Sequence, residues 1–323
     1  MKNTIKIFAL SLTAGAMLAS CDSYLDRQPD EPLTSDNIFK KQKTTLQYLT
    51  NIYSYQPDYE APACVSSYND IPWEACSDET SFSYLDRAYT QINYNSWNPS
   101  LPNYRDDTYN TLYKGIREAN YFMQNVHKCP PEELNDVDKG YYYNEARFLR
   151  AYFYAMMLPV YGPVFLIGDD PVDFTQGTLD QRERNTWNEC VDYVANELWE
   201  ASKGLPDSWP DIYYGRATKG AALAARARLL LYSARKLFNG NDLYKGIVNR
   251  NGDHLFPTQY DEKKWELAAQ AAKDVMNLNL YSLVGADGTD PYASFNTLFT
   301  SVGSGTGATE KICLLYTSDA ADD

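Results

Sequence analysis

The stretch YYYNEARFLRAYFYAMMLPVYGPVFLI, from Tyr141 to Ile167, decides the fold. Its first part places side chains three and four residues apart, at Tyr141, Glu145, Phe148, Tyr152 and Ala155. That spacing brings them onto one face of an α-helix. We expect Pro159 and Gly162 to end this helix, because proline lacks a backbone N–H and glycine readily follows a last turn. The stretch therefore predicts a long helix and a turn.

Helical patterns continue on both sides of this stretch. An earlier helix is expected from Ser35 to Tyr53, with Ser35 or Asp36 as its N-cap. The other expected helices cover residues 109–126, 186–201, 218–238 and 261–276. Each repeats apolar residues at helical spacing, so each is expected to bury one face.

Caps and small residues add detail to the last three helices. Thr186 and Glu189 have the spacing of a capping box, and Asp261 is the expected cap of the final helix. The helix at 218–238 carries alanines at 221, 222, 224, 225 and 227, which would let neighbouring helices approach closely. In the final helix, the expected core stripe is Trp265, Ala268, Ala272 and Met276.

The predicted class is mostly all-α, with tetratricopeptide-like helix pairs and long irregular loops. A strict 34-residue consensus is not visible. Between Gln56 and Tyr104 the chain carries five prolines among many Tyr, Trp, Asn and Ser residues, which predicts a long loop region. Loops of this length are usually functional or disordered, and this one is too aromatic for disorder.

The N-terminal residues have the pattern of an export signal. Residues 1–20 combine lysines at 2 and 6 with an apolar run from Ile7 to Leu18, which is too short to span a bilayer. The sequence LASC, ending at Cys21, resembles a bacterial lipobox. This resemblance implies a lipoprotein signal peptide over 1–20, lipidation of Cys21 and an anchored tether over 21–34.

Composition excludes several classes of protein. The 323 residues carry 29 Lys and Arg against 43 Asp and Glu, a net charge of −14, so nucleic acid is not an expected partner. No C-x-x-C pair predicts zinc, and no motif predicts a cofactor. Export permits disulfides, and a bridge between Cys64 and Cys76 remains one possibility.

Several segments resemble the SusD/RagB family of nutrient-uptake lipoproteins. The most specific is EARFLRAYFY at 145–154 followed by YGPVFLI at 161–167. Further matches in the same order are DSYLD at 22–26, IREAN at 116–120, RATKGA at 216–221, and Trp265 with AAQAAK at 268–273. The resemblance implies a SusD-like helical fold at the outer membrane, facing the cell surface. It also implies glycan cargo and a SusC-like TonB-dependent transporter as partner.

The aromatic loop region supplies the candidate ligand-binding residues. Sugar rings pack their C–H faces on Trp or Tyr, while their hydroxyls bind carboxylates, amides and arginines. By comparison with glycan-binding members of the family, the candidates are Trp73, Asp78, Glu79, Arg87, Tyr94, Trp97 and Asn98. The alternative is that these aromatic side chains only hold a long loop against the helices.

Other polar clusters favour structural roles. Glu145, Arg147 and Arg150 are expected to position their helix, and loop acids at 169, 170 and 173 lack the spacing of a calcium-binding loop. With two histidines and no nucleophile motif, catalysis is not expected, although a glycosidase needs only two carboxylates. Peptide cargo, or a scaffold that contacts only the transporter, remains the alternative function.

The last residues depart from the pattern before them. Residues 313–323, CLLYTSDAADD, continue no helix or strand and resemble translated sequencing-adapter read-through. We predict that the natural gene continues differently from about residue 313, so that the SusD-like domain over 35–312 is incomplete at its C-terminal end.

Overall fold

The computed structural model describes residues 35–57, 77–78, 94–96, 104–169, 182–288, 290–300 and 312. The chain divides into two units, Met1–Ile38 and Phe39–Asp323. The described part of the first unit is the short helix α3, Ser35–Ile38. In the second unit the described elements are helices, and one isolated bridge pairs Val248 with His254.

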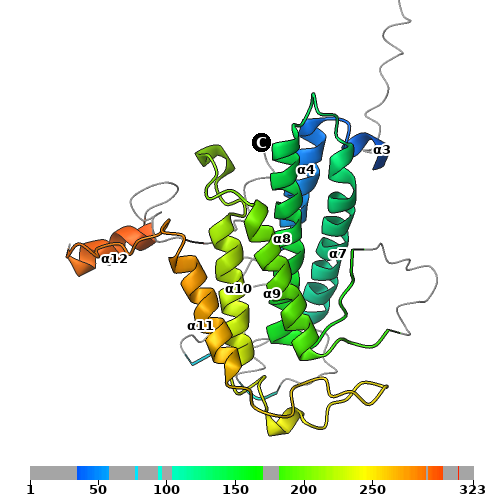
Figure 1. The fold of residues 1–323 in the computed structure, drawn as a ribbon, viewed down its shortest axis with the longest axis vertical. Coiled ribbons are helices and arrows are strands. Elements are labelled where there is room, and N and C mark those ends of the chain that lie inside the picture. Colours follow the sequence, from blue (N-terminus) through cyan, green and yellow to red (C-terminus); the bar gives the residue numbers. More distant parts are fainter. Residues whose placement is uncertain are drawn as a thin grey trace, which may run out of the picture. The chain divides into compact units, whose positions relative to one another are not determined.

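The described second unit consists of helices, of which α7 to α11 lie side by side in chain order (Figure 1). They are α4 (Gln42–Tyr53), α7 (Tyr104–Asn125), α8 (Asp136–Tyr161), α9 (Trp187–Gly204), α10 (Lys219–Ala234), α11 (Lys263–Met276) and α12 (Pro291–Thr300), with 3-10 turns at Val126–Lys128, Asp211–Tyr213 and Asp242–Tyr244. From α7 to α11, each helix packs on the next one, and α4 packs on α7 and α8. The predicted mostly-α class with paired helices is confirmed.

The capping box predicted for α9 is confirmed, whereas the cap predicted at Ser35 or Asp36 is wrong because both residues lie inside α3. Thr186 and Glu189 form a complete capping box at the start of α9, each side chain accepting from the other residue's backbone N–H. Thr218 caps α10 by accepting from the N–H of Ala221 at 3.2 Å. Asp261 was predicted to cap α11 and accepts from the N–H of Lys263 at 3.0 Å, but the N-cap position of that helix is Glu262, which makes no side-chain cap hydrogen bond. The capping box of α9 bonds only within its own first turn, so sequence spacing predicts it.

The core is formed by the inner faces of these helices. Leu112, Ile116, Phe148, Phe153 and Leu198 are each fully buried. In α10 the alanines at 221, 222 and 225 are buried, so α9 and α11 can both pack against it. The close approach predicted from the alanine-rich sequence is therefore present.

Three predicted helix ends need correction. The helix expected from Ser35 to Tyr53 is interrupted, because the backbone of Lys41 is extended (φ −134°, ψ 147°). Pro159 lies inside the last turn of α8, and the helix ends at Gly162, whose φ of 68° suits glycine. The helix predicted over 218–238 ends at Ala234.

The core stripe predicted for α11 is wrong for three of its four residues. Ala268 is buried, but Ala272 is exposed, Trp265 is 41% exposed and Met276 is 76% exposed. The buried face instead consists of Ala268, Ala271 and Val275. The alanine-rich helix offers two apolar faces, and the packing against α10 selects one of them.

Candidate functional site

The structure describes two of the seven predicted ligand-binding residues. Asp78 and Tyr94 lie on two separate short described pieces, and both are exposed, Tyr94 to 63%. The other five, Trp73, Glu79, Arg87, Trp97 and Asn98, lie outside the described residues, as do Cys21 and the pair Cys64 and Cys76. The site proposed in the aromatic loop therefore stays a prediction.

The carboxylate of Glu145 on α8 is fully buried and paired. Arg216 donates from Nε and Nη2 to Oε1 and Oε2 of Glu145, at 2.9 and 2.5 Å. The hydroxyl of Tyr53 on α4 also donates to Glu145 and accepts from the N–H of Ala217 at 2.9 Å. The bidentate ion pair links α8 to the loop before α10, and the bond from Tyr53 links α8 to α4. Glu145 therefore has a structural role.

Aromatic rings surround the same guanidinium. The central carbon of Arg216 lies 4.0 Å from the ring centre of Trp209, 4.8 Å from Tyr142 and 5.1 Å from Tyr213. Trp209 is held by a hydrogen bond from Nε1 to the carbonyl of Ala217 at 2.7 Å. Cation–π contacts of this kind strengthen a partly buried ion pair.

Glu197 on α9 joins both arginines of the signature helix. Arg147 donates to its two oxygens at 3.0 and 2.6 Å, and Arg150 donates from Nη2 at 2.5 Å. Arg150 also binds Asn120 on α7 and Asp169 in the loop after α8. Burial raises the pKa of Glu197, but the hydrogen bonds from Arg147 and Arg150 outweigh it and lower that pKa below its ordinary value.

Tyrosine hydroxyls hold the segment that follows α8. Tyr113 donates to the carbonyl of Phe165 at 2.9 Å and accepts from its N–H at 3.1 Å. Tyr154 makes the same pair of bonds with Ile167, at 3.3 and 2.8 Å. The hydroxyls satisfy backbone groups of a buried, non-helical segment, which explains the need for tyrosine here.

Buried thiols and loop acids show no reactive arrangement. Cys129 and Cys190 are buried and unbridged, and burial raises the pKa of the Cys190 thiol to about 11. Asp169 accepts a hydrogen bond from Arg150, while Asp170 and Asp173 lie outside the described residues. Within the described part of the chain, no group of three or more His, Cys, Asp or Glu residues could hold a metal ion.

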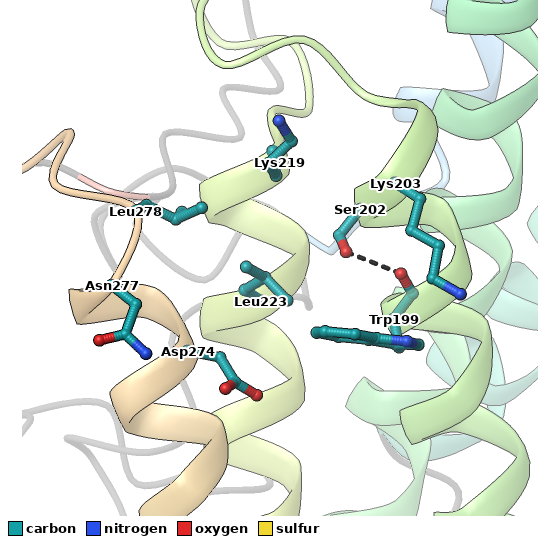
Figure 2. A pocket seen from close by; sticks show the side chains of 8 residues that line it. All are labelled: Trp199, Ser202, Lys203, Lys219, Leu223, Asp274, Asn277 and Leu278. Atoms are coloured by element: carbon teal, nitrogen blue, oxygen red, sulfur yellow. Dashed lines mark hydrogen bonds between the residues drawn. The ribbon is translucent and has the colours of Figure 1, made fainter.

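An open groove lies between α9, α10 and α11 (Figure 2). It has a volume of about 330 Å³, at the lower end of the range for small-molecule sites. It is lined by Trp199, Ser202, Lys203, Lys219, Leu223, Asp274, Asn277 and Leu278. On α9, Ser202 and Lys203 lie three and four positions after Trp199, and on α10 Leu223 lies four after Lys219, so each set shares one helix face. Asp274 is on α11, whereas Asn277 and Leu278 directly follow that helix.

The groove has an apolar floor and charged ends. Leu223 on α10 lies at its centre, while Trp199 and Asp274 point toward each other from α9 and α11 (Figure 2). At one end Arg226 pairs with Asp274 at 3.2 Å and lies 5.2 Å from the Trp199 ring centre. At the other end stands Lys219. Trp199 is 37% exposed as a residue, and the ammonium of Lys203 lies 5.6 Å from the centre of its ring.

Sequence reasoning missed this groove. Its residues come from three helices between positions 199 and 278, and no local motif joins them. One signal was available, since Trp199 lies beside the buried stripe of α9 with Lys203 one turn later.

None of the helices in the described ranges is both long and apolar enough to cross a membrane.

Comparisons with known proteins identify the family. The profile of the SusD-like family described as "Starch-binding associating with outer membrane" matches residues 23–231. A SusD-like protein of Bacteroides ovatus is 26% identical over 280 residues, covering 84% of this chain and 44% of its own length.

Solved structures show the same helical fold. The structure named BT4246 matches with a TM-score of 0.65 and 27% identity, covering 77% of this chain and 42% of its own. A laminarin-binding SusD-like protein matches with a TM-score of 0.50 and 19% identity, covering 62% of this chain and 42% of its own. This chain therefore spans less than half the length of these relatives. Because the family profile matches residues 23–231 and the helical stack has the same fold, the chain belongs to the SusD-like family.

Proposed function

We propose that this protein is a cell-surface glycan-binding lipoprotein that captures oligosaccharides for a SusC-like TonB-dependent outer-membrane transporter. The family match over residues 23–231 carries this proposal, because that family is described as starch-binding and associated with the outer membrane. The fold it shares with a laminarin-binding SusD-like protein is a second support. In this proposal the protein binds and delivers its ligand without chemical change.

The anchor and the glycan site come from the sequence. Lipidation of Cys21 would hold the protein on the outer membrane, where a short acidic tether leads to the helical stack. The aromatic loop region would supply the glycan contacts, through Trp73, Trp97 and their polar neighbours. Aromatic faces with adjacent carboxylates and amides suit sugar rings, which have both apolar faces and hydroxyl edges.

The test is calorimetry of the protein without residues 1–21 against a panel of neutral polysaccharides. Trp73→Ala and Trp97→Ala should weaken the binding of the active polysaccharide by about tenfold or more, because aromatic anchors dominate such contacts. Trp265→Ala is the matched control, since Trp265 lies on α11 and outside the loop region. Unchanged binding in both loop variants would contradict the loop site.

The alternative functions give different results in the same assay. If no polysaccharide binds, a peptide pull-down tests peptide cargo. Co-purification with the transporter alone, with no ligand of either kind, would support the scaffold function instead.

A further inference from the structure

We propose that the groove between α9, α10 and α11 binds a sugar residue that carries a carboxylate, such as a uronic acid. The inference rests on the proposed glycan-binding function and adds a site and a ligand class to it. The groove lies on helices far along the chain from the aromatic loop of residues 56–104.

The shape and the apolar walls of the groove suit one face of a sugar ring. Trp199 presents a partly exposed ring, and Leu223 and Leu278 supply aliphatic surface beside it. Across the groove stands Asn277, whose side-chain amide can bond sugar hydroxyls both as donor and as acceptor. An apolar floor with a few polar groups on the rim is the usual form of a ligand site.

The charges favour an anion. The whole chain has a net charge of −14, yet two of the three charged residues that line the groove are lysines, Lys203 and Lys219. The third, Asp274, already pairs with Arg226 at 3.2 Å and accepts from Gln270 at 2.9 Å. The side chain of Asp274 is 21% exposed in this pair, whereas those of Lys203 and Lys219 are 53% and 31% exposed.

The partners of the lysines can be displaced. Lys203 pairs with Glu200 at 2.5 Å and Lys219 pairs with Asp207 at 2.6 Å, and the side chains of all four are about a third exposed or more. Solvent-exposed ion pairs contribute little free energy. A ligand carboxylate held by the groove walls can therefore replace Asp207 on Lys219 at small cost.

The start of α10 packs closely against the segment after α11. A Cβ atom at Gly220 would overlap the hydroxyl of Tyr281, which follows Leu278 closely in sequence. Lys219 and Leu278 lie at this same end of the groove (Figure 2).

The experiment compares two matched ligands on the full chain by calorimetry: a trimer of galacturonic acid and the same trimer with its carboxylates reduced to alcohols. We expect the acid trimer to bind about tenfold tighter, since its carboxylate can accept a charge-assisted hydrogen bond from Lys219. Lys219→Gln and Trp199→Ala should each remove most of this preference. Asp207→Asn should strengthen binding, because it removes the competing carboxylate.

Matched variants separate the groove from general effects. Lys245→Gln removes another exposed lysine that pairs with a nearby aspartate, and Trp265→Ala removes another half-exposed tryptophan. Neither should change the affinity. If Trp199→Ala fails to fold, Lys219→Gln still tests the groove, because Lys219 is on the rim and its replacement leaves the helix packing in place.

The outcomes distinguish the two proposals. Equal binding of both trimers, or binding of the acid trimer that the groove variants leave unchanged, overturns the acidic-sugar site while glycan binding stands. If neither trimer binds but a neutral polysaccharide does, the acidic-sugar site is likewise overturned and glycan binding stands. No binding of any glycan overturns both proposals.

Discussion

At the scale of single residues, two buried carboxylates organise the signature helix and its neighbours. Glu145 on α8 and Glu197 on α9 are 0% and 6% exposed, and arginines hold both. Each pair joins segments about 50 to 70 positions apart in the sequence. Removing one member of a buried pair leaves an unbalanced charge, which destabilises far more than the loss of an exposed pair.

Glu197→Gln should lower the free energy of unfolding at pH 7 by about 3 kcal/mol, because Arg147 and Arg150 would lose their shared anion. The fold lowers the pKa of Glu197 below its ordinary value. The stabilisation is therefore fully present above the ordinary glutamate pKa. It is lost as the pH falls through the lower pKa of the folded state. Urea unfolding across acidic pH checks this.

The difference between wild type and Glu197→Gln should therefore shrink as the pH falls below about 4. Glu200→Gln, an exposed carboxylate on the same helix, should change stability by about 0.5 kcal/mol or less. A difference for Glu197→Gln that stays constant with pH would show that its effect comes from packing instead of charge.

At the scale of helices, local chemistry sets where each one begins, and packing sets which face it buries. The capping box of α9 and the threonine cap of α10 follow directly from residue spacing. The choice between two apolar faces of α11 does not, because both faces satisfy helical periodicity. The interruption near Lys41 likewise could not be predicted from the sequence, because no proline or glycine lies there.

Thr186→Ala should destabilise the protein by about 1 kcal/mol, since it removes the acceptor for the N–H of Glu189. Thr186→Ser keeps that acceptor, so it should destabilise the protein by no more than about half as much as Thr186→Ala. Thermal unfolding followed by circular dichroism measures both. Equal destabilisation by Ala and Ser would mean that the methyl group, and not the cap, stabilises α9.

At the scale of the whole molecule, the helical stack is one part of a longer arrangement in the relatives. The chain covers 42% to 44% of the length of the relatives described above. Within the described residues, α11 exposes a second apolar face that includes Trp265 and Met276. The same helix, α11, therefore carries this exposed apolar face and also contributes Asp274 to the wall of the groove.

Cys21→Ala should release the protein from the membrane fraction of cells that express the full chain. In the proposed function, the acyl chains on Cys21 supply the attachment to the membrane. Membrane fractionation followed by immunoblotting measures this, and Cys64→Ala is the control. Retention of Cys21→Ala in the membrane fraction at the wild-type level would contradict the anchor.

The sequence by itself determined the helical class, the capping box of α9, the family resemblance and the structural role of Glu145, Arg147 and Arg150. These features depend on residues within one or two turns of each other, or on motifs that the family keeps in order. The tertiary structure decided which distant groups meet: Arg216 with Glu145, Glu197 with both arginines, and the three helices that line the groove. Helical periodicity specifies the faces of a helix but not its neighbours, because those contacts join residues far apart in the chain.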